Sequence, residues 1–201
     1  MVSAAELGSP ASDGRRPWRA RIEARLSSKP SEPRPAGGTR PAAVLVPIVE
    51  RAEPTVLLTL RTEHLPTHAG QVSFPGGRFQ AGDDSLTETA LREFEEEIGI
   101  ERKSVDLAGY LDFHETVNSG FLILPVVGFV HEDFVLRVDT YEVAEVFEAP
   151  LEFLLDPKNR VRMRAERGGI MREFDAIPFG RHTIWGATAA MIVDLAKRLR
   201  D

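Results

Sequence analysis

The stretch that decides the fold of this chain runs from Gly76 to Ile100 and reads GGRFQAGDDSLTETALREFEEEIGI. A glycine turn leads into a helix that ends in a run of carboxylates. The sequence Phe74-Pro75-Gly76-Gly77 predicts a tight turn, because glycine alone adopts positive φ without steric cost. Carboxylates packed this densely repel one another unless a positive charge lies among them. The stretch therefore indicates a site for a divalent cation.

The helix in this stretch is predicted over Ser85–Ile98. Ser85 and Glu88 have the spacing of a capping box, and Asp84 adds negative charge where the helix dipole is positive. Gly99 is the usual residue to end a helix in the left-handed conformation. Both ends of this helix are therefore specified by local sequence.

At helical periodicity the apolar and acidic side chains of this helix separate onto adjacent sides. The apolar side consists of Ala90, Leu91, Phe94 and Ile98, and the acidic side of Glu93, Glu96 and Glu97 with Thr89. Like charges at these spacings destabilise a bare helix by roughly 0.2–0.5 kcal/mol per pair, and a bound cation would reverse that sign. Two interpretations stay open: a solvated acidic face, which charge runs usually form, or a cation site whose carboxylates Arg92 pairs with and directs.

Composition limits the classes of protein to which this chain can belong. Its 201 residues, 42% of them hydrophobic, suffice for one domain with a buried core. There is no cysteine, which excludes disulfides and thiolate catalysis and makes a cytoplasmic location the expectation. The formal net charge of −6 argues against a nucleic-acid-binding surface. The longest apolar run, 42–46, is far shorter than the roughly 20 residues that span a bilayer, so no membrane segment is expected.

Residues 1–38 are predicted to form a largely flexible N-terminal segment, because their prolines and small residues bury little apolar surface. Within this segment a short helix is predicted near 17–27, where Trp18, Ile22 and Leu26 recur at helical spacing. The arginines of this helix are expected to form a solvated face; they are Arg19, Arg21 and Arg25. Residues 39–201 are predicted to form the folded domain.

The remaining segments alternate between strand-like and helical patterns. Strands are predicted at 42–49, 55–60, 105–113, 121–130 and 141–148, a short helical turn at 151–155, and a hairpin of 161–164 with 170–174 across Gly168-Gly169. The last helix is predicted over 184–199, with Thr183 as its cap and an apolar stripe of Trp185, Ala189, Ile192, Leu195 and Leu199. These segments predict an α/β/α sandwich around a central mixed β-sheet. A parallel Rossmann arrangement is weaker, because no helix separates the central strands.

The segment 61–73 is predicted to be a loop, and it carries His64 and His68. Two histidines four residues apart bind zinc when they share a helical face. Pro66 lies between them and disfavours a helix, so no zinc site is predicted here.

The carboxylate run also resembles a known motif. Residues 92–100, REFEEEIGI, match the Arg-Glu-apolar-x-Glu-Glu-x-Gly-apolar core of the Nudix box at every defined position. Upstream, the usual glutamate eight residues before the arginine corresponds to Asp84, and the usual glycine position falls on Arg78, so that Gly77 lies one residue early. The resemblance implies a Nudix-type α/β/α sandwich whose entry loop is one residue longer than in the commonest form.

The longer loop and the segment before it resemble the coenzyme A pyrophosphatase branch of Nudix hydrolases. The matching segments are 57–61, 64–65, 68–72 and 74–77, followed by 147–151, 153–156 and 184–189, so that the similarity covers roughly residues 40–200. Thr62 stands where that signature has Ser or Ala, and Pro66 stands where it has Arg. Because an arginine beside the site could contact phosphate, the second departure bears on recognition of the 3′-phosphate of coenzyme A.

The resemblance implies roles for particular residues. Glu93 and Glu97 are the expected principal ligands of Mg²⁺ or Mn²⁺, with Glu96 as a further ligand or as the group that orients water. Arg92 is expected to orient carboxylates, and Gly77 to offer a backbone carbonyl to the metal. The expected substrate contacts are Arg61, Gly76, Gly77 and Arg78. The general base stays open between a glutamate of the box and an acid of a later loop; the later candidates are Glu115, Glu142 and Glu145.

The implied reaction is attack of water on one phosphorus of a diphosphate linkage. The expected substrate is coenzyme A or an acyl derivative, and the products are adenosine 3′,5′-bisphosphate and 4′-phosphopantetheine or its acyl form. One alternative is a diphosphatase for another nucleoside diphosphate compound, such as ADP-ribose or a dinucleotide, which Pro66 keeps open. Another is a non-catalytic Nudix-fold binding module, which the intact Glu93, Glu96 and Glu97 disfavour. A homodimer is also left open.

Overall fold

The computed structural model describes residues 15–31, 38–116, 120–167 and 170–200. The helices are α1 (Arg15–Glu23), α2 (Leu86–Ile98), α3 (Leu151–Leu155) and α4 (Gly186–Arg198), with short 3₁₀ turns η1 (Arg102–Ser104) and η2 (Pro157–Asn159). The strands are β1 (Arg40–Val49), β2 (Thr55–Arg61), β3 (Val72–Ser73), β4 (Gly76–Arg78), β5 (Val105–Tyr110), β6 (His114–Glu115), β7 (Phe121–Val130), β8 (Val143–Pro150), β9 (Val161–Arg167), β10 (Ile170–Phe179) and β11 (His182–Trp185). None of the helices in these ranges is both long and apolar enough to cross a membrane.

A mixed sheet forms the centre of the fold. Its main path runs β3-β2-β1-β7-β5, while β4 pairs with β1, β6 with β7 and β8 with β2. The pairing of β1 with β7 is parallel, and the other pairings in this sheet are antiparallel. The mixed sheet predicted from the sequence is therefore confirmed.

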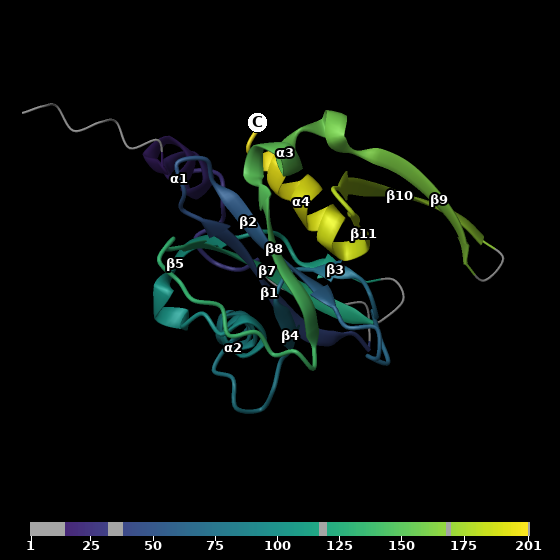
Figure 1. Ribbon diagram of the computed structural model, residues 1–201, viewed down its shortest axis with the longest axis horizontal. Coiled ribbons are helices and arrows are strands. Elements are labelled where there is room, and N and C mark those ends of the chain that lie inside the picture. The colour runs from purple at the N-terminus through teal and green to yellow at the C-terminus, as the bar shows by residue number, and fades with distance from the viewer. Residues whose placement is uncertain (1–14, 32–37, 117–119, 168–169, 201) are drawn as a thin grey trace, which may run out of the picture.

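Helices cover both faces of this sheet, with α2 and α4 on opposite sides (Figure 1). Because successive side chains of a strand point to opposite faces, neighbours on β1 enter different cores. Leu45 packs in the cluster that contains Phe94 of α2, whereas Val46 packs in the cluster that contains Ile192 of α4. The α/β/α sandwich is thus confirmed, and β1 is buried on both faces as its Val, Ile and Leu content predicts.

The ends of α2 agree with their local signals. Ser85 precedes the helix as its N-cap, and its hydroxyl accepts a hydrogen bond from the backbone N–H of Glu88 at 3.2 Å. The carboxylate of Glu88 binds Arg102, so it does not complete a reciprocal capping box. Gly99 ends the helix at φ 73°, in the left-handed region where glycine is favoured.

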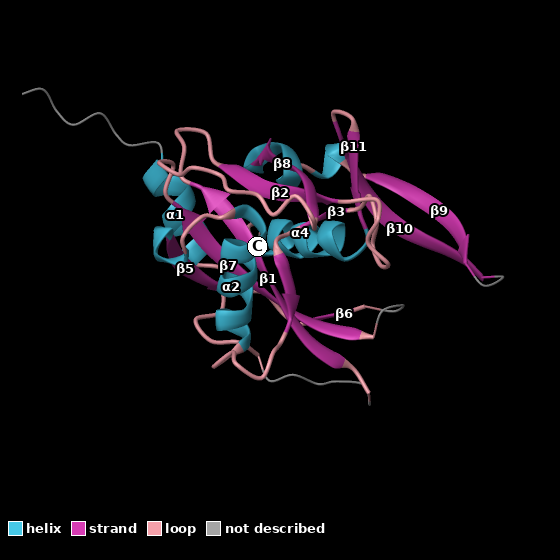
Figure 2. Ribbon diagram, turned by 60° about the horizontal axis from the view of Figure 1, so that its bottom comes forward, coloured by secondary structure: helices cyan, strands magenta, loops and turns pink. Residues whose placement is uncertain are grey.

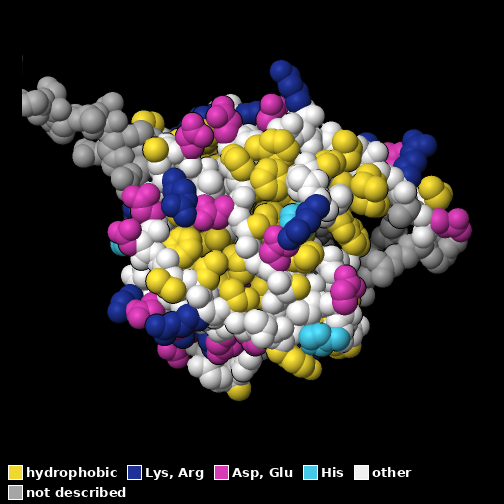
Figure 3. Space-filling view, in the orientation of Figure 1, with side chains coloured by type: hydrophobic (Ala, Val, Ile, Leu, Met, Phe, Trp, Pro, Cys, Tyr) yellow, Lys and Arg dark blue, Asp and Glu magenta, His cyan; other side chains and the backbone are white. Residues whose placement is uncertain are grey.

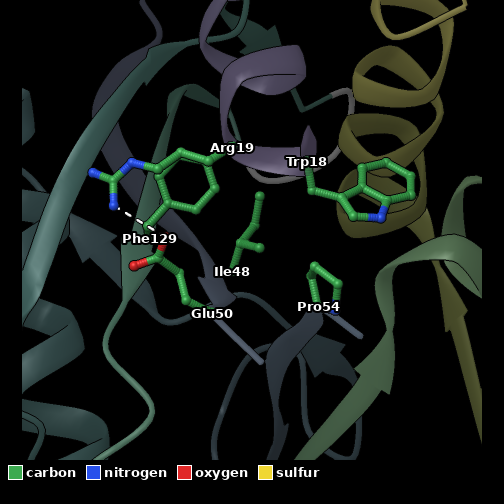
Figure 4. Close-up of a pocket in the computed structure, with 6 residues that line it drawn as sticks. All are labelled: Trp18, Arg19, Ile48, Glu50, Pro54 and Phe129. Atoms are coloured by element: carbon green, nitrogen blue, oxygen red, sulfur yellow. Dashed lines mark hydrogen bonds and ion pairs between the residues drawn. The ribbon is translucent and has the colours of Figure 1, made fainter. Parts of the chain in front are cut away.

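Helix α1 lies against the sandwich and is held there by both apolar and ionic contacts. Ile22 is fully buried, and Trp18 packs against the same core. Arg19 reaches two carboxylates of the domain: Glu50 at 3.0 Å, as Figure 4 shows, and Asp106 at 2.9 Å. The prediction of a solvated arginine face is therefore wrong for Arg19, because these distant carboxylates could not be seen from the helix alone.

The C-terminal part differs most from the prediction. β9, β10 and β11 form a second, three-stranded sheet, and Figures 1 and 2 show the β9–β10 pair extending beyond the sandwich. The predicted hairpin is present, with its turn residues Gly168-Gly169 outside the described residues. Thr183 lies in β11 opposite Pro178, so its prediction as the cap of the last helix is wrong. The helix starts two residues after Ile184, which is buried in the strand opposite Ile177.

Charged side chains of both signs are interspersed on the face drawn in Figure 3. Some arginines and glutamates form ion pairs that connect separate elements of the fold. Arg51 binds Glu148 of β8 through two hydrogen bonds of 2.8 and 2.7 Å, and Arg181 binds Glu145 at 2.5 Å. Glu148 and Glu145 are therefore bound to arginines and do not belong to the acidic face of α2.

Candidate active site

The acidic face of α2 packs directly against β4. Gly76 and Gly77 pair with β1, which fixes them as an extended ledge above the helix. The N–H of Gly76 donates to Oε2 of Glu97 at 3.3 Å. A Cβ atom added to Gly77 would lie 2.4 Å from the carboxylate of Glu93. Two glutamates of α2 therefore converge on this pair of glycines.

The reason for the glycines differs from the prediction. Neither Gly76 nor Gly77 has positive φ, so the predicted tight turn that requires left-handed glycine is wrong. A Cβ on Gly76 would lie 2.4 Å from the carbonyl oxygen of Ala43 on β1. The missing side chains instead permit the close approach of β4 to β1 on one side and to the Glu93 carboxylate on the other.

The electrostatics of this pair of glutamates favour a cation. The side chain of Glu97 is only 4% exposed, and its burial raises the pKa of the carboxyl to about 8. Nearby Arg61 opposes that rise, while Glu93 and Glu142 add to it. Burial also raises the pKa of Glu93. The carboxylate oxygens of Glu93 and Glu97 are the ligands that a hard divalent ion such as Mg²⁺ or Mn²⁺ prefers, and such an ion would stabilise their ionised forms.

Arg92 directs the carboxylates around it. Its guanidinium binds both oxygens of Asp83, with Nε to Oδ1 at 2.7 Å and Nη2 to Oδ2 at 3.1 Å. Its Nη1 lies 2.8 Å from Glu93 and 2.9 Å from Glu96. The predicted pairing of Arg92 with neighbouring carboxylates is therefore observed, and it sets the direction of the Glu93 side chain.

Asp83 was missed by sequence reasoning, which placed Asp84 at the corresponding position of the motif. Asp83 is buried, whereas Asp84 is exposed. The carboxylate of Asp83 also accepts hydrogen bonds from the N–H of Gln80 at 3.0 Å and from the hydroxyl of Thr89 at 2.8 Å. Its bond with Arg92 holds the pKa of Asp83 well below the usual range. The sequence signal for Asp83 was the longer entry loop. One extra residue between the acid and Arg92 moves the inward-facing acid from position 84 to position 83.

Glu96 lies at the rim of the site. Its side chain is 60% exposed, compared with 15% for Glu93 and 4% for Glu97. The three predicted ligands are therefore unequal: two converge on the glycine ledge, and the third faces solvent beside Arg92. The structure does not bring all three together to the same degree.

Arg61 and Glu142 complete the site opposite α2. Nη1 of Arg61 lies 3.6 Å from Glu97, and its Nη2 lies 3.7 Å from Glu142. The backbone N–H of Thr62 donates to the carbonyl of Glu142 at 3.0 Å, which holds the loop before β8 against the end of β2. Glu142, which follows Arg61 by 81 positions in the sequence, thus joins the carboxylates of the helix.

The other predicted residues have different surroundings. Glu145 binds Arg181 and lies 3.5 Å from His182, and Glu115 is exposed on β6 opposite Leu122. The guanidinium of Arg78 is 5.2 Å from the centre of the Phe121 ring, while its carbonyl accepts a hydrogen bond from Arg92. Among the three later-loop acids, only Glu142 lies beside the carboxylates of α2.

A second group of metal-ligand side chains has a structural role. Ligand atoms of Glu50, Asp106 and His131 lie within 4.8 Å of one another. Figure 4 shows Arg19 reaching the carboxylate of Glu50, and the same guanidinium binds Asp106. Because a positive group already balances these carboxylates, the group attaches α1 to the domain.

Comparison with known proteins shows the family of this chain. The sequence model of the NUDIX domain matches residues 39–165. A protein of Yersinia enterocolitica named "Uncharacterized Nudix hydrolase NudL" is 44% identical over 158 residues, covering 79% of this chain and 80% of the relative. The chain belongs to the Nudix hydrolase family. A NudL protein of Photorhabdus laumondii is 38% identical and covers 87% of this Nudix hydrolase and 93% of the relative.

The fold has a counterpart among solved structures. The crystal structure of a MutT/nudix family protein from Enterococcus faecalis matches with a TM-score of 0.53 at 17% identity, covering 96% of this chain and 76% of that protein. Nudix hydrolases generally use divalent metal ions. The glutamates that face the glycine ledge are therefore in a family in which such a site is expected.

Proposed function

We propose that this Nudix hydrolase cleaves the diphosphate bond of coenzyme A and its acyl derivatives. The products are adenosine 3′,5′-bisphosphate and 4′-phosphopantetheine, or the acyl form of the latter. The observation that carries the chemistry is the convergence of Glu93 and Glu97 on Gly76-Gly77, beside the guanidinium of Arg61. The choice of coenzyme A rests on the sequence resemblance of the segment 57–77.

The side chains proposed to hold the metal are Glu93 and Glu97, with Gly77 offering its carbonyl and Glu96 joining from the rim. When bound, Mg²⁺ or Mn²⁺ supplies charge neutralisation for the diphosphate and lowers the pKa of a coordinated water. The raised pKa of buried Glu97 means that its ionised form is unfavourable when no cation is nearby. A bound dication would stabilise that ionised carboxylate, which supports Glu97 as a ligand.

Three further residues position the reacting groups. Arg92 fixes Glu93 and Glu96 through its Nη1, so that the carboxylates keep their direction when substrate enters. Arg61 lies between Glu97 and Glu142 and presents positive charge to the diphosphate oxygens. Gly76 donates its backbone N–H to Glu97 at 3.3 Å and so holds that carboxylate in place.

We assign the general base to Glu142. Its side chain is 43% exposed, which leaves its carboxylate accessible to water. Glu145 is engaged with Arg181 and His182 and is thus excluded from this role. In the proposed step, Glu142 accepts a proton from the attacking water as the oxygen bonds to phosphorus and the bridging oxygen leaves with the other phosphate.

Another nucleoside diphosphate substrate, such as ADP-ribose or a dinucleotide, is the second candidate. Pro66 is exposed in the loop after β2, at the position where the coenzyme A signature has arginine. Thr62 has a different effect: it is buried, and its hydroxyl donates to the carbonyl of Tyr141 at 2.9 Å. Thr62 therefore retains the hydroxyl of the serine found in the signature, and only Pro66 favours the second candidate.

A substrate panel tests the proposal. Purified protein with Mg²⁺ or Mn²⁺ is incubated with coenzyme A, acetyl coenzyme A, ADP-ribose and a dinucleoside polyphosphate, and products are separated by chromatography. Coenzyme A should be turned over with the highest kcat/KM. Preference for ADP-ribose would overturn the substrate assignment, and turnover of none would favour a binding module. Glu145→Gln is the matched control, because it removes a carboxylate that lies outside the site.

A further inference from the structure

Beside the proposed catalytic groups, two aromatic side chains form an exposed pair. Tyr141 precedes β8 and is 67% exposed, and His64 is exposed in the loop after β2. Their ring centroids are 4.8 Å apart, with an angle of 56° between the ring planes. Burial of a large aromatic ring is strongly stabilising, so a ring left this exposed contributes little of that stabilisation.

The backbone that carries Tyr141 is held firmly although the ring is exposed. The N–H of Tyr141 donates to Oδ1 of Asp139 at 2.9 Å, and its carbonyl accepts from the hydroxyl of Thr62 at 2.9 Å. The N–H of Asp139 in turn donates to the backbone carbonyl of Glu97 at 2.9 Å. The ring is thus presented on a loop that is attached to the C-terminal turn of α2.

The position of this pair relates it to the diphosphate. Tyr141 is the residue directly before Glu142, whose carboxylate lies 3.7 Å from Arg61. His64 is three residues after Arg61 on the other segment. The two segments that supply the charged groups opposite α2 therefore each carry one ring of this pair, within three residues of those groups in the sequence.

We propose that Tyr141, supported by His64, is the platform on which the nucleobase of the substrate stacks. This inference rests on the proposed function in that it assumes a nucleoside diphosphate in the same site. A nucleobase is joined to its diphosphate through a ribose, so a ring on the segment that carries Glu142 can contact the base while the diphosphate lies at the carboxylates. An exposed tyrosine ring offers a π-face to any base and favours stacking over hydrogen-bonded selection of one base.

Binding measurements without turnover test the platform. Calorimetric titrations with ADP and with inorganic pyrophosphate, each in the presence of Mg²⁺, compare a ligand that has a base with one that lacks it. Tyr141→Ala should weaken ADP binding about 10-fold and leave pyrophosphate binding unchanged, because removal of a stacked ring typically costs that much or more. Tyr141→Phe should bind ADP within about twofold of the wild type, since the π-face is retained.

The matched control is Trp185→Ala, which removes another partly exposed aromatic ring from a different sheet and should affect neither ligand. Equal weakening of both ligands by Tyr141→Ala would assign the residue to loop structure, and no weakening of either would exclude it from the site; either result overturns the platform. Binding of ADP does not depend on hydrolysis of coenzyme A. A protein that fails the substrate panel but shows the ADP-selective loss would therefore refute the proposed function and retain the platform.

Discussion

Replacement of Glu97 by glutamine separates the catalytic interpretation of the acidic helix from the purely structural one. Metal-free protein carries a cost at this position, because burial raises the pKa of Glu97 from its ordinary 4.5 to about 8. The folded state binds the proton more tightly than the unfolded state between these values, so stability of the wild type falls as pH rises through that window. Converted at about 1.4 kcal/mol per pH unit, the cost reaches a ceiling of about 5 kcal/mol above pH 8.

The variant removes this charge but introduces an amide that must find partners in a buried site, so we expect about half of the ceiling or less to be recovered. A gain of about 1–3 kcal/mol corresponds to a Tm increase of about 3–10 °C for a domain of this size. The increase should be present at pH 8.5 in EDTA and should vanish as pH falls below the ordinary pKa of 4.5, where the wild-type carboxyl becomes protonated in both states. Hydrolysis of coenzyme A should be lost at every pH.

Thermal unfolding in EDTA and in saturating Mg²⁺ provides the assay. Mg²⁺ at about 100 times its Kd should stabilise the wild type by about 2.7 kcal/mol and the variant by much less. A fall in the Tm of Glu97→Gln at pH 8.5 in EDTA would refute the reasoning, since it would show that the carboxylate stabilises the metal-free fold. Glu145→Gln serves as the control, because Glu145 pairs with Arg181 away from the site.

Three further changes probe the groups around this glutamate. Asp83→Asn should destabilise the fold by about 2 kcal/mol at neutral pH, because it weakens the two charge-assisted hydrogen bonds from Arg92 and leaves that guanidinium only Glu93 and Glu96 as carboxylate partners, whereas the exposed Asp84→Asn should have little effect. Since Asp83 has a lowered pKa, its contribution to the free energy of unfolding is complete above about pH 4 and is lost as pH falls further, so urea unfolding of wild type and variant should converge in acid. Gly77→Ala should displace the Glu93 carboxylate and reduce kcat/KM about 100-fold, with a change in Tm below about 3 °C; an active variant would contradict the ledge geometry. Glu142→Gln should lower kcat about 100-fold or more, and an unchanged kcat would exclude this base.

Local signals account for the parts of the fold that could be predicted. The ends of α2 follow from Ser85 and Gly99, which act within one turn of the helix. The buried central strands follow from continuous apolar composition. The start of α4 could not be found in this way, because Ile184 and Trp185 fit the apolar spacing of the following helix as well as a strand. Only the pairing of β11 with β10 distinguishes these two readings.

The candidate site was predictable to the extent that it is contained in one helix. Glu93, Glu97 and the directing role of Arg92 follow from helical spacing, whereas the choice of Asp83 over Asp84 depends on the path of the entry loop. The approach of Glu142 requires the register of β8 against β2, which no local pattern specifies. The division at residue 38, the cytoplasmic location and a homodimer stay predictions.

The most direct test of the central claim is product analysis after incubation of the protein with coenzyme A and Mg²⁺ in ¹⁸O-labelled water. Mass spectrometry should find adenosine 3′,5′-bisphosphate and 4′-phosphopantetheine in equal amounts. One of these two products should carry one ¹⁸O atom, in the phosphate that water attacked. The same incubation with Glu97→Gln should yield neither product. Absence of both products from the wild type, or their continued release by the variant, would contradict the assignment of this site.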